Sequence, residues 1–155
     1  MPAQPEGQDA KYSKKIVPIS IGYERRTGPD FVESLVAHNV TALVDVRESA
    51  FSRKVDFRKN RLRQLLDEKG IEYFHVRSAG NPFRKTAVSL EECLKKYKKF
   101  VAKEANLNRI RGDLLPVFES HVRVAFLCYE RESEDCHRTP LIKSLGFENP
   151  TVVVE

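Results

Sequence analysis

Five residues near the C-terminus have the types and the spacing of a reactive site. They form two short elements, a Cys-x-Glu element and a Cys-His-Arg triplet: Cys128, Glu130, Cys136, His137 and Arg138. A thiolate can act as a nucleophile, an imidazole as a general acid or base, and a guanidinium as an anion ligand. We predict that they line one polar pocket, with Cys136, His137 and Glu130 as catalytic candidates and Cys128 and Arg138 in substrate or anion binding.

The position of Pro140 explains why Cys136 could be reactive. Proline is tolerated only in the first turn of a helix, so a helix is expected to begin at or shortly before Thr139. Cys136 then lies at the positive N-terminal end of that helix, which lowers the pKa of a thiol and attracts anions. Cys128 ends an apolar run, where simple core packing is the alternative to a functional role.

Zinc is the metal that these residue types would bind. Cys128, Cys136 and His137 offer sulfur and nitrogen ligands, with Glu130 or His75 as further candidates. The seven-residue gap between the cysteines is not the short Cys-x-x-Cys spacing, and adjacent side chains do not readily chelate one ion. We therefore predict no metal and no cofactor, and keep zinc as an alternative.

A second set of polar residues follows the earlier apolar runs and is predicted to bind the substrate or an anion: Gly22, Tyr23, Arg47, Ser52 and Arg53. Asp45 is the catalytic candidate of this region. Asp45 and Arg47 alternate along the chain and so share a face, where one could be a general acid or base and the other hold an anion. The alternative is a buried ion pair of Asp45 with Arg138 or Arg53.

Apolar periodicity predicts the elements that position these residues. Short apolar runs predict strands at residues 16–21, 42–46, 71–75, 122–128 and 151–154, and the run 122–128 is expected to be central. Helical spacing predicts helices at residues 30–39, 59–69, 89–105 and 139–146. Residues 107–120 are predicted to be helical in two pieces, because Gly112 and Pro116 oppose a continuous helix. Asp30 is the expected cap of the first of these, and Ser89 with Glu92 forms a capping box.

The alternation of strands and helices is typical of a parallel sheet with right-handed crossovers. We predict an α/β fold: a single three-layer domain over residues 16–155, with a mostly parallel sheet of about five strands and helices on both faces. Ligands bind such sheets outside the carboxyl ends of the strands. The polar residues above all follow predicted strands, so they are expected to gather at that edge.

Four short sequence elements together resemble a known family. They are Cys128-x-Glu130, Cys136-His137-Arg138, Ser20-Ile-Gly22-Tyr23 and Asp45-Val-Arg47. With them the chain resembles the domain-of-unknown-function family 488 (DUF488) over roughly residues 16–155. The resemblance implies a small α/β fold with these elements in one pocket, and supplies no settled activity, cofactor or substrate. Residues 49–51 and 78–81 depart from the usual family pattern, which bears on loop shape and substrate choice.

The bulk composition limits the class of protein. The chain has 155 residues and a formal net charge of +5. It has no apolar run long enough for a membrane span and no secretion signal at its start, so we expect a cytoplasmic protein with a disordered tail over residues 1–15. One basic segment predicts a weak nucleic-acid surface: Arg58, Lys59, Arg61 and Arg63.

Three functions are compatible with these observations. The first is a small enzyme acting on a phosphate-bearing substrate, either a nucleotide or a nucleic acid. The alternative is a non-catalytic nucleic-acid-binding module with a structural Cys-His-Arg cluster. The third is a thiol redox or metal sensor, which requires Cys128 and Cys136 to lie within bonding distance. The sequence predicts no oligomeric state.

Overall fold

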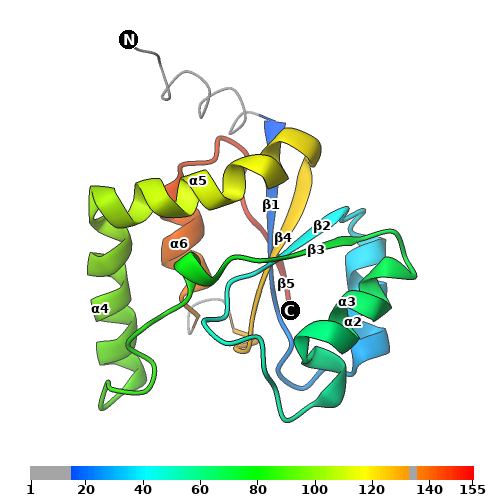
Figure 1. The fold of residues 1–155 in the computed structure, drawn as a ribbon, viewed down its shortest axis with the longest axis horizontal. Coiled ribbons are helices and arrows are strands. Elements are labelled where there is room, and N and C mark those ends of the chain that lie inside the picture. The colour runs from blue at the N-terminus through cyan, green and yellow to red at the C-terminus, as the bar shows by residue number, and fades with distance from the viewer. Residues whose placement is uncertain (1–14, 133–135) are drawn as a thin grey trace.

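A computed structural model describes residues 15–132 and 136–155, so the tail predicted over residues 1–15 lies outside the described part of the chain except for Lys15. Five strands form one sheet in which all pairs are parallel, in the order β3-β2-β4-β1-β5 (Figure 1). The strands are β1 (Val17–Gly22), β2 (Ala42–Asp45), β3 (Glu72–His75), β4 (Arg123–Cys128) and β5 (Val152–Val154). This confirms the predicted α/β fold and places β4 at the centre.

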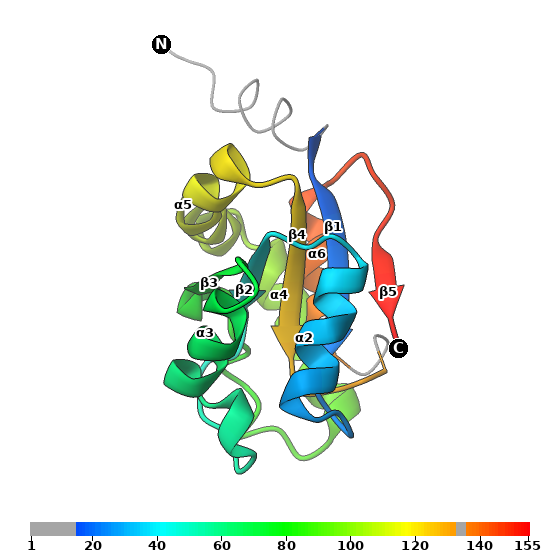
Figure 2. The same ribbon diagram turned by 90° about the vertical axis from the view of Figure 1, so that its right-hand side faces the viewer.

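Helices cover both faces of the sheet, as Figures 1 and 2 show. On one face, α2 (Gly28–Ala37) and α3 (Lys59–Asp67) pack on alternate strand residues such as Leu43 and Leu127. On the other face, α4 (Leu90–Ala102), α5 (Glu104–Ser120) and α6 (Arg138–Leu145) pack on the intervening residues, among them Val44 and Phe126. Successive side chains of a strand point to opposite faces, which divides the core into these two layers. The three-layer prediction is confirmed.

The start of α2 differs from the expectation. Thr27 is the cap, and its side chain accepts a hydrogen bond from the backbone N–H of Asp30 at 3.2 Å. Pro29 lies in the first turn, where the missing N–H costs nothing. Asp30 therefore lies within the first turn rather than at the cap predicted for it.

Helix α5 is continuous, so the predicted interruption at Gly112 and Pro116 is wrong. Ile110, Leu114 and Val117 are buried against the sheet, and this packing holds the helix together across both residues. Gly112 and Pro116 lie on the exposed side, where water can bind the carbonyl group that has lost its helical partner. The predicted single run to residue 105 instead ends at Ala102, and Lys103 separates α4 from α5.

We expect Pro116→Ala to stabilise the protein. The alanine restores the N–H that proline lacks and removes the ring from an exposed helix interior, for a gain of about 1–3 kcal/mol in the free energy of unfolding. Urea unfolding followed by circular dichroism measures the change. A variant less stable than the parent would show that the proline ring is needed where it lies.

None of the described helices is both long and apolar enough to cross a membrane.

Candidate functional site

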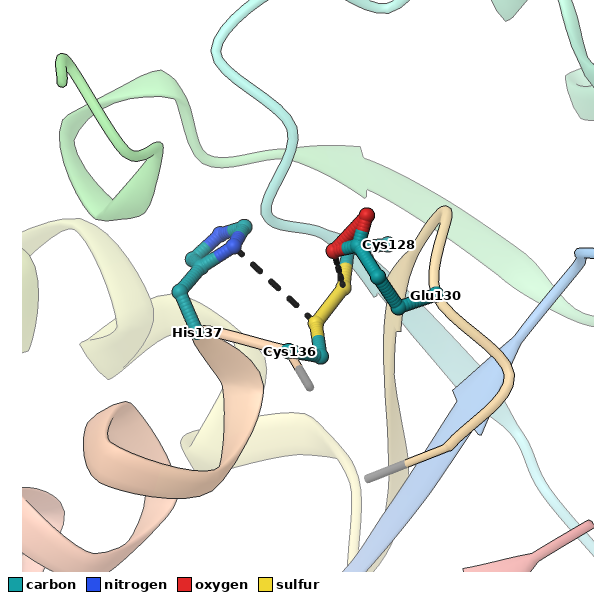
Figure 3. Close-up of side chains that lie close together, drawn as sticks. All are labelled: Cys128, Glu130, Cys136 and His137. Carbon is teal, nitrogen blue, oxygen red and sulfur yellow. Dashed lines mark hydrogen bonds between the residues drawn. A yellow bond between two sulfur atoms is a disulfide. The ribbon is translucent and has the colours of Figure 1, made fainter. Parts of the chain in front are cut away.

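Four side chains converge where β4 ends and α6 begins (Figure 3). One potential ligand atom from each of Cys128, Glu130, Cys136 and His137 lies within 4.8 Å of the others. Cys136 Sγ is 4.0 Å from Nδ1 of His137, and Cys128 Sγ is 3.7 Å from Oε1 of Glu130. The structure therefore brings together the two elements that the sequence placed in one pocket.

The two cysteines of this cluster are bonded to each other. Cys128 and Cys136 form a disulfide, and both are fully buried. The bonding distance that the redox or metal hypothesis requires is met. Neither sulfur is a thiol in this state, so the nucleophilic role of Cys136 applies to the reduced protein and stays a prediction. Cys93 is a buried free cysteine on α4, beside the amide of Asn81.

Two N–H groups of Arg138 point at the sulfur atoms. Its Nη1 donates to Cys128 Sγ at 3.3 Å, and its backbone N–H donates to Cys136 Sγ at 3.4 Å. Hydrogen bonds and a nearby positive charge both favour the anionic form of a thiol. The environment predicted from the helix N-terminus is therefore present around both sulfurs.

Arg138 is itself fully buried. Its Nε donates to Ser20 Oγ and its Nη1 to the backbone carbonyl of Glu130, both at 2.8 Å. Burial lowers the pKa of Arg138 to about 10. Among the described atoms, Nη2 finds no hydrogen-bond partner. Its guanidinium joins β1 to the segment after β4, and its predicted contact with a bound anion stays a prediction.

The contacts of His137 define its protonation. Its Nε2 lies 2.9 Å from the backbone carbonyl of Val46, which can only accept, so Nε2 carries the hydrogen. Burial lowers the pKa of His137 to about 4, so the ring is neutral at pH 7. The lone pair of Nδ1 then faces Cys136. A neutral imidazole held in this tautomer can act as a base or as a metal ligand.

Glu130 lies at the partly exposed side of the cluster. Its Oε2 accepts from Nη2 of Arg84 at 2.7 Å, and its other oxygen faces Cys128. Burial raises the pKa of Glu130, although Arg84 and Arg138 oppose this shift.

Asp45 and Arg47 pair with each other, on the other side of the sheet. Nε and Nη2 of Arg47 donate to the two carboxylate oxygens of Asp45, at 2.8 and 2.6 Å, and Tyr73 also donates to this carboxylate. Burial opposes the charge on Arg47, but Asp45 raises its pKa above the ordinary value. A buried ion pair of Asp45 with Arg138 or Arg53 was the alternative to a functional role for Asp45 and Arg47. That choice of partner is wrong, because Arg138 faces the opposite helical layer and Arg53 lies on an exposed loop.

A pocket of about 560 Å³ opens above this edge of the sheet. The loops after β1, β2 and β4, the loop before α4 and the start of α6 line it, as parallel-sheet topology predicts. Five of its lining residues were predicted from the sequence as site residues: Tyr23, Arg47, Ser52, Arg53 and His137. It therefore joins the region of Asp45 and Arg47 to the cysteine cluster at His137.

The sequence did not identify several further residues of this pocket, among them Lys54, Arg84, Lys85 and Tyr129. Tyr129 is the middle residue of the Cys-x-Glu element, and its ring packs edge-on against Tyr23 with centroids 5.4 Å apart. Arg84 and Lys85 are adjacent cations in the loop that follows the third strand. Their place after a parallel strand is the signal that could have identified them.

The four residues of the predicted nucleic-acid surface have different surroundings. Arg58 donates to the carbonyl of Ser52 at 2.9 Å, and Arg61 pairs with Asp56 at 3.3 Å. Lys59 and Arg63 face a different groove, of about 830 Å³, which His75 also lines. His75 binds the carbonyl of Arg47 at 2.7 Å and is not part of the cysteine cluster.

The fold and the site together define an all-parallel α/β protein with a Cys/His/Glu cluster at the carboxyl edge of its sheet. The chain belongs to the DUF488 family, described as a domain of unknown function, whose family model matches residues 29–145. This confirms the resemblance, although the element from Ser20 to Tyr23 lies outside the matched segment. No curated protein and no solved structure matches the chain.

Proposed function

We propose that this protein is a small enzyme that acts on a phosphate-bearing substrate, and that a nucleotide is the class that fits best. The observation that carries the proposal is the composition of the 560 Å³ pocket, which combines cations, exposed aromatic rings and the imidazole of His137. Enzyme pockets of this size, at the carboxyl edge of a parallel sheet, enclose small ligands.

The cations of the pocket exceed its acidic groups. Arg47 and Arg84 are paired with Asp45 and Glu130. Within residues 15–132 and 136–155, no carboxylate forms an ion pair with the other three cations of the pocket: Arg53, Lys54 and Lys85. Their charge favours a substrate with one or more phosphate groups.

The aromatic residues favour a substrate that also carries a planar ring. Phe51 and Tyr129 line the pocket and remain 63% and 38% exposed. Nucleotide bases stack on such side chains, which stabilises binding by about 1–3 kcal/mol per base. A ring and a phosphate on one molecule describe a nucleotide.

The chemistry in this proposal belongs to the wall formed by His137. In the reduced protein, Nδ1 of the neutral ring lies beside Cys136 and can accept the proton of its thiol. Arg138 and the start of α6 stabilise the resulting thiolate. His137 lines the pocket and Cys136 lies buried behind it, so attack on a substrate held by the cations requires the imidazole to move aside.

The test combines binding with turnover in the reduced protein. Calorimetry should show that nucleoside phosphates bind, and that the unphosphorylated nucleoside binds at least tenfold more weakly. Arg53→Gln and Lys85→Gln should each weaken nucleotide binding by about tenfold, which corresponds to about 1.4 kcal/mol. Cys136→Ser should still bind the nucleotide but form no product, and chromatography of the reaction mixture measures product formation.

Lys95→Gln is the matched control, since Lys95 is an exposed cation of α4 that does not line the pocket. If Lys95→Gln lost as much affinity, the effect of the pocket variants would come from the overall charge of the protein rather than from the pocket. Full turnover by Cys136→Ser would remove the thiol from the mechanism. Binding of single-stranded oligonucleotides alone, lost when the basic residues of α3 are replaced, would favour the nucleic-acid-binding module instead.

Thiol redox switching is a second candidate, and the bonded pair Cys128–Cys136 favours it. The cluster touches the pocket through His137, so opening the bond would alter the pocket wall. In this function the pocket would bind its ligand differently in the reduced and oxidised protein.

A further inference from the structure

We propose that the reduced protein binds a zinc ion through Cys128, Cys136, His137 and Glu130. This inference does not depend on which substrate the pocket binds. It uses the same Cys136 and His137 atoms as the proposed chemistry, so zinc binding and that chemistry exclude each other. It also reverses the sequence-based expectation, which rested on the spacing of the cysteines and on the adjacency of Cys136 and His137.

The spacing of the ligand atoms suits a tetrahedral ion. Zinc binds sulfur at about 2.3 Å and nitrogen or oxygen at about 2.0–2.2 Å, which places tetrahedral ligand atoms about 3.3–3.8 Å apart. The distance from Cys136 Sγ to His137 Nδ1 is 4.0 Å, and that from Cys128 Sγ to Glu130 Oε1 is 3.7 Å. All four atoms lie within 4.8 Å of one another while the two sulfurs are bonded to each other (Figure 3), so reduction must first separate the sulfurs before an ion can lie between them.

The fold explains how such unusual spacing in sequence produces one site. Cys128 ends β4, whereas Cys136 and His137 lie at the start of α6. Helix α6 packs on the face of the sheet to which the Cys128 side chain points. The carbonyl of Val46 holds Nε2 of His137, and the other ring nitrogen, Nδ1, lies 4.0 Å from Cys136 Sγ. The adjacent residues therefore present their ligand atoms to the same point.

Each ligand also has the outer partner that metal sites require. The imidazole donates its Nε2 hydrogen to Val46, which leaves Nδ1 for the ion. Arg138 donates to both sulfurs, and Arg84 holds the carboxylate of Glu130. Two thiolates and one carboxylate exceed the charge of a zinc ion by one, and the buried guanidinium of Arg138 alone offsets this excess.

The metal-bound and disulfide forms exclude each other. Reduction of the Cys128–Cys136 bond by an external dithiol transfers two electrons and two protons, oxidises that dithiol to its own disulfide, and yields two thiols. Zinc binding then releases the two thiol protons. The Cα atoms of the pair are 7.2 Å apart, whereas disulfides usually span about 4.4–6.8 Å. An ion between the two sulfurs suits this wider separation.

The first experiment titrates the full-length, dithiol-reduced protein with Zn²⁺ or Co²⁺ under anaerobic conditions. We expect one equivalent to bind, with thiolate-to-cobalt charge-transfer absorption, and two of the three cysteines to become protected from alkylation. The oxidised protein should bind neither ion. These measurements use the unaltered chain, so they do not depend on whether a variant folds.

Variants then assign the ligands. Cys128→Ser, Cys136→Ser and His137→Ala should each weaken Zn²⁺ binding by more than about a hundredfold, because even outer partners contribute ten- to a hundredfold. Cys93→Ser is the matched control and should bind as the parent does, since this buried cysteine lies on α4 away from the cluster. Glu130→Gln should reduce affinity less than loss of a sulfur.

Three outcomes overturn the proposal. One is a folded, reduced protein that binds neither ion, and another is a cobalt spectrum without thiolate absorption. The third is a loss of affinity in Cys93→Ser equal to that in Cys136→Ser. Loss of nucleotide binding leaves this result untouched, and absence of zinc leaves the proposed chemistry available, so the failure of one proposal is distinguishable from the failure of the other.

Discussion

Replacement of Asp45 by asparagine is expected to lower the free energy of unfolding by about 3–5 kcal/mol. Asp45 is 0% exposed and Arg47 is 4% exposed, and the two form a bidentate pair. The amide that replaces the carboxylate leaves the buried guanidinium without a counter-charge. Urea unfolding by circular dichroism, with both proteins in the same redox state, measures the loss.

Asp56→Asn provides the matched control. Asp56 pairs with Arg61 at 3.3 Å, but these side chains are 36% and 42% exposed, so the loss should stay below about 1 kcal/mol. Adding Arg47→Met to Asp45→Asn should recover part of the stability, because the unpaired buried charge is then gone. Equal effects of the two asparagine variants would contradict the role given to burial.

This pair also shows what the sequence could and could not predict at the site. Alternation along the chain placed Asp45 and Arg47 on one face, and that is correct. Their position relative to Cys128 depends on strand register, because Asp45 is aligned with Leu127 rather than with Cys128. A register shift by one residue would exchange the faces, and a single sequence does not determine it. The cluster around Cys128 and the pair at Asp45 therefore lie on opposite faces.

The elements themselves were predictable because their signals are local. The strands coincide with apolar, β-branched runs, and Gly70 and Gly146 have the positive φ angles expected at the ends of two helices. Helix α5 was not predictable in the same way, since its continuity comes from the burial of Ile110 and Leu114. Local propensity at Pro116 opposed the helix, and tertiary packing outweighed it.

Side-chain convergence in the cysteine cluster was predicted only in part. The helix N-terminus beside Cys136 follows from Pro140, which the sequence shows directly. The direction of the His137 ring follows from the carbonyl of Val46, which belongs to a distant segment. Adjacent residues on a chain point in different directions unless such a contact holds them. The sequence-based argument that adjacent Cys136 and His137 do not readily chelate one ion could not include that contact.

Gly22→Ala is expected to destabilise the protein by about 3 kcal/mol or more and to disturb the cysteine cluster. Gly22 ends β1 beside Cys128, and a Cβ atom there would overlap the backbone carbonyl of Glu130 and the Cα of Arg131. Backbone atoms cannot rotate away as a side chain can, so the cost reaches the upper range of overpacking. Moving the Glu130 carbonyl also breaks its hydrogen bond from Arg138.

Gly112→Ala separates this close approach from the general effect of replacing glycine. A Cβ at Gly112 meets nothing within 4 Å, and the residue lies in the exposed part of α5. The free energy of unfolding of this variant should rise by about 0.4–1 kcal/mol, because alanine gives the unfolded chain less conformational entropy than glycine does. Thermal and urea unfolding of both variants give the comparison. Gly22→Ala that unfolded at the same urea concentration as the parent would show that the backbone of Glu130 can move away at no cost. The backbone would then not hold Glu130 in the cluster.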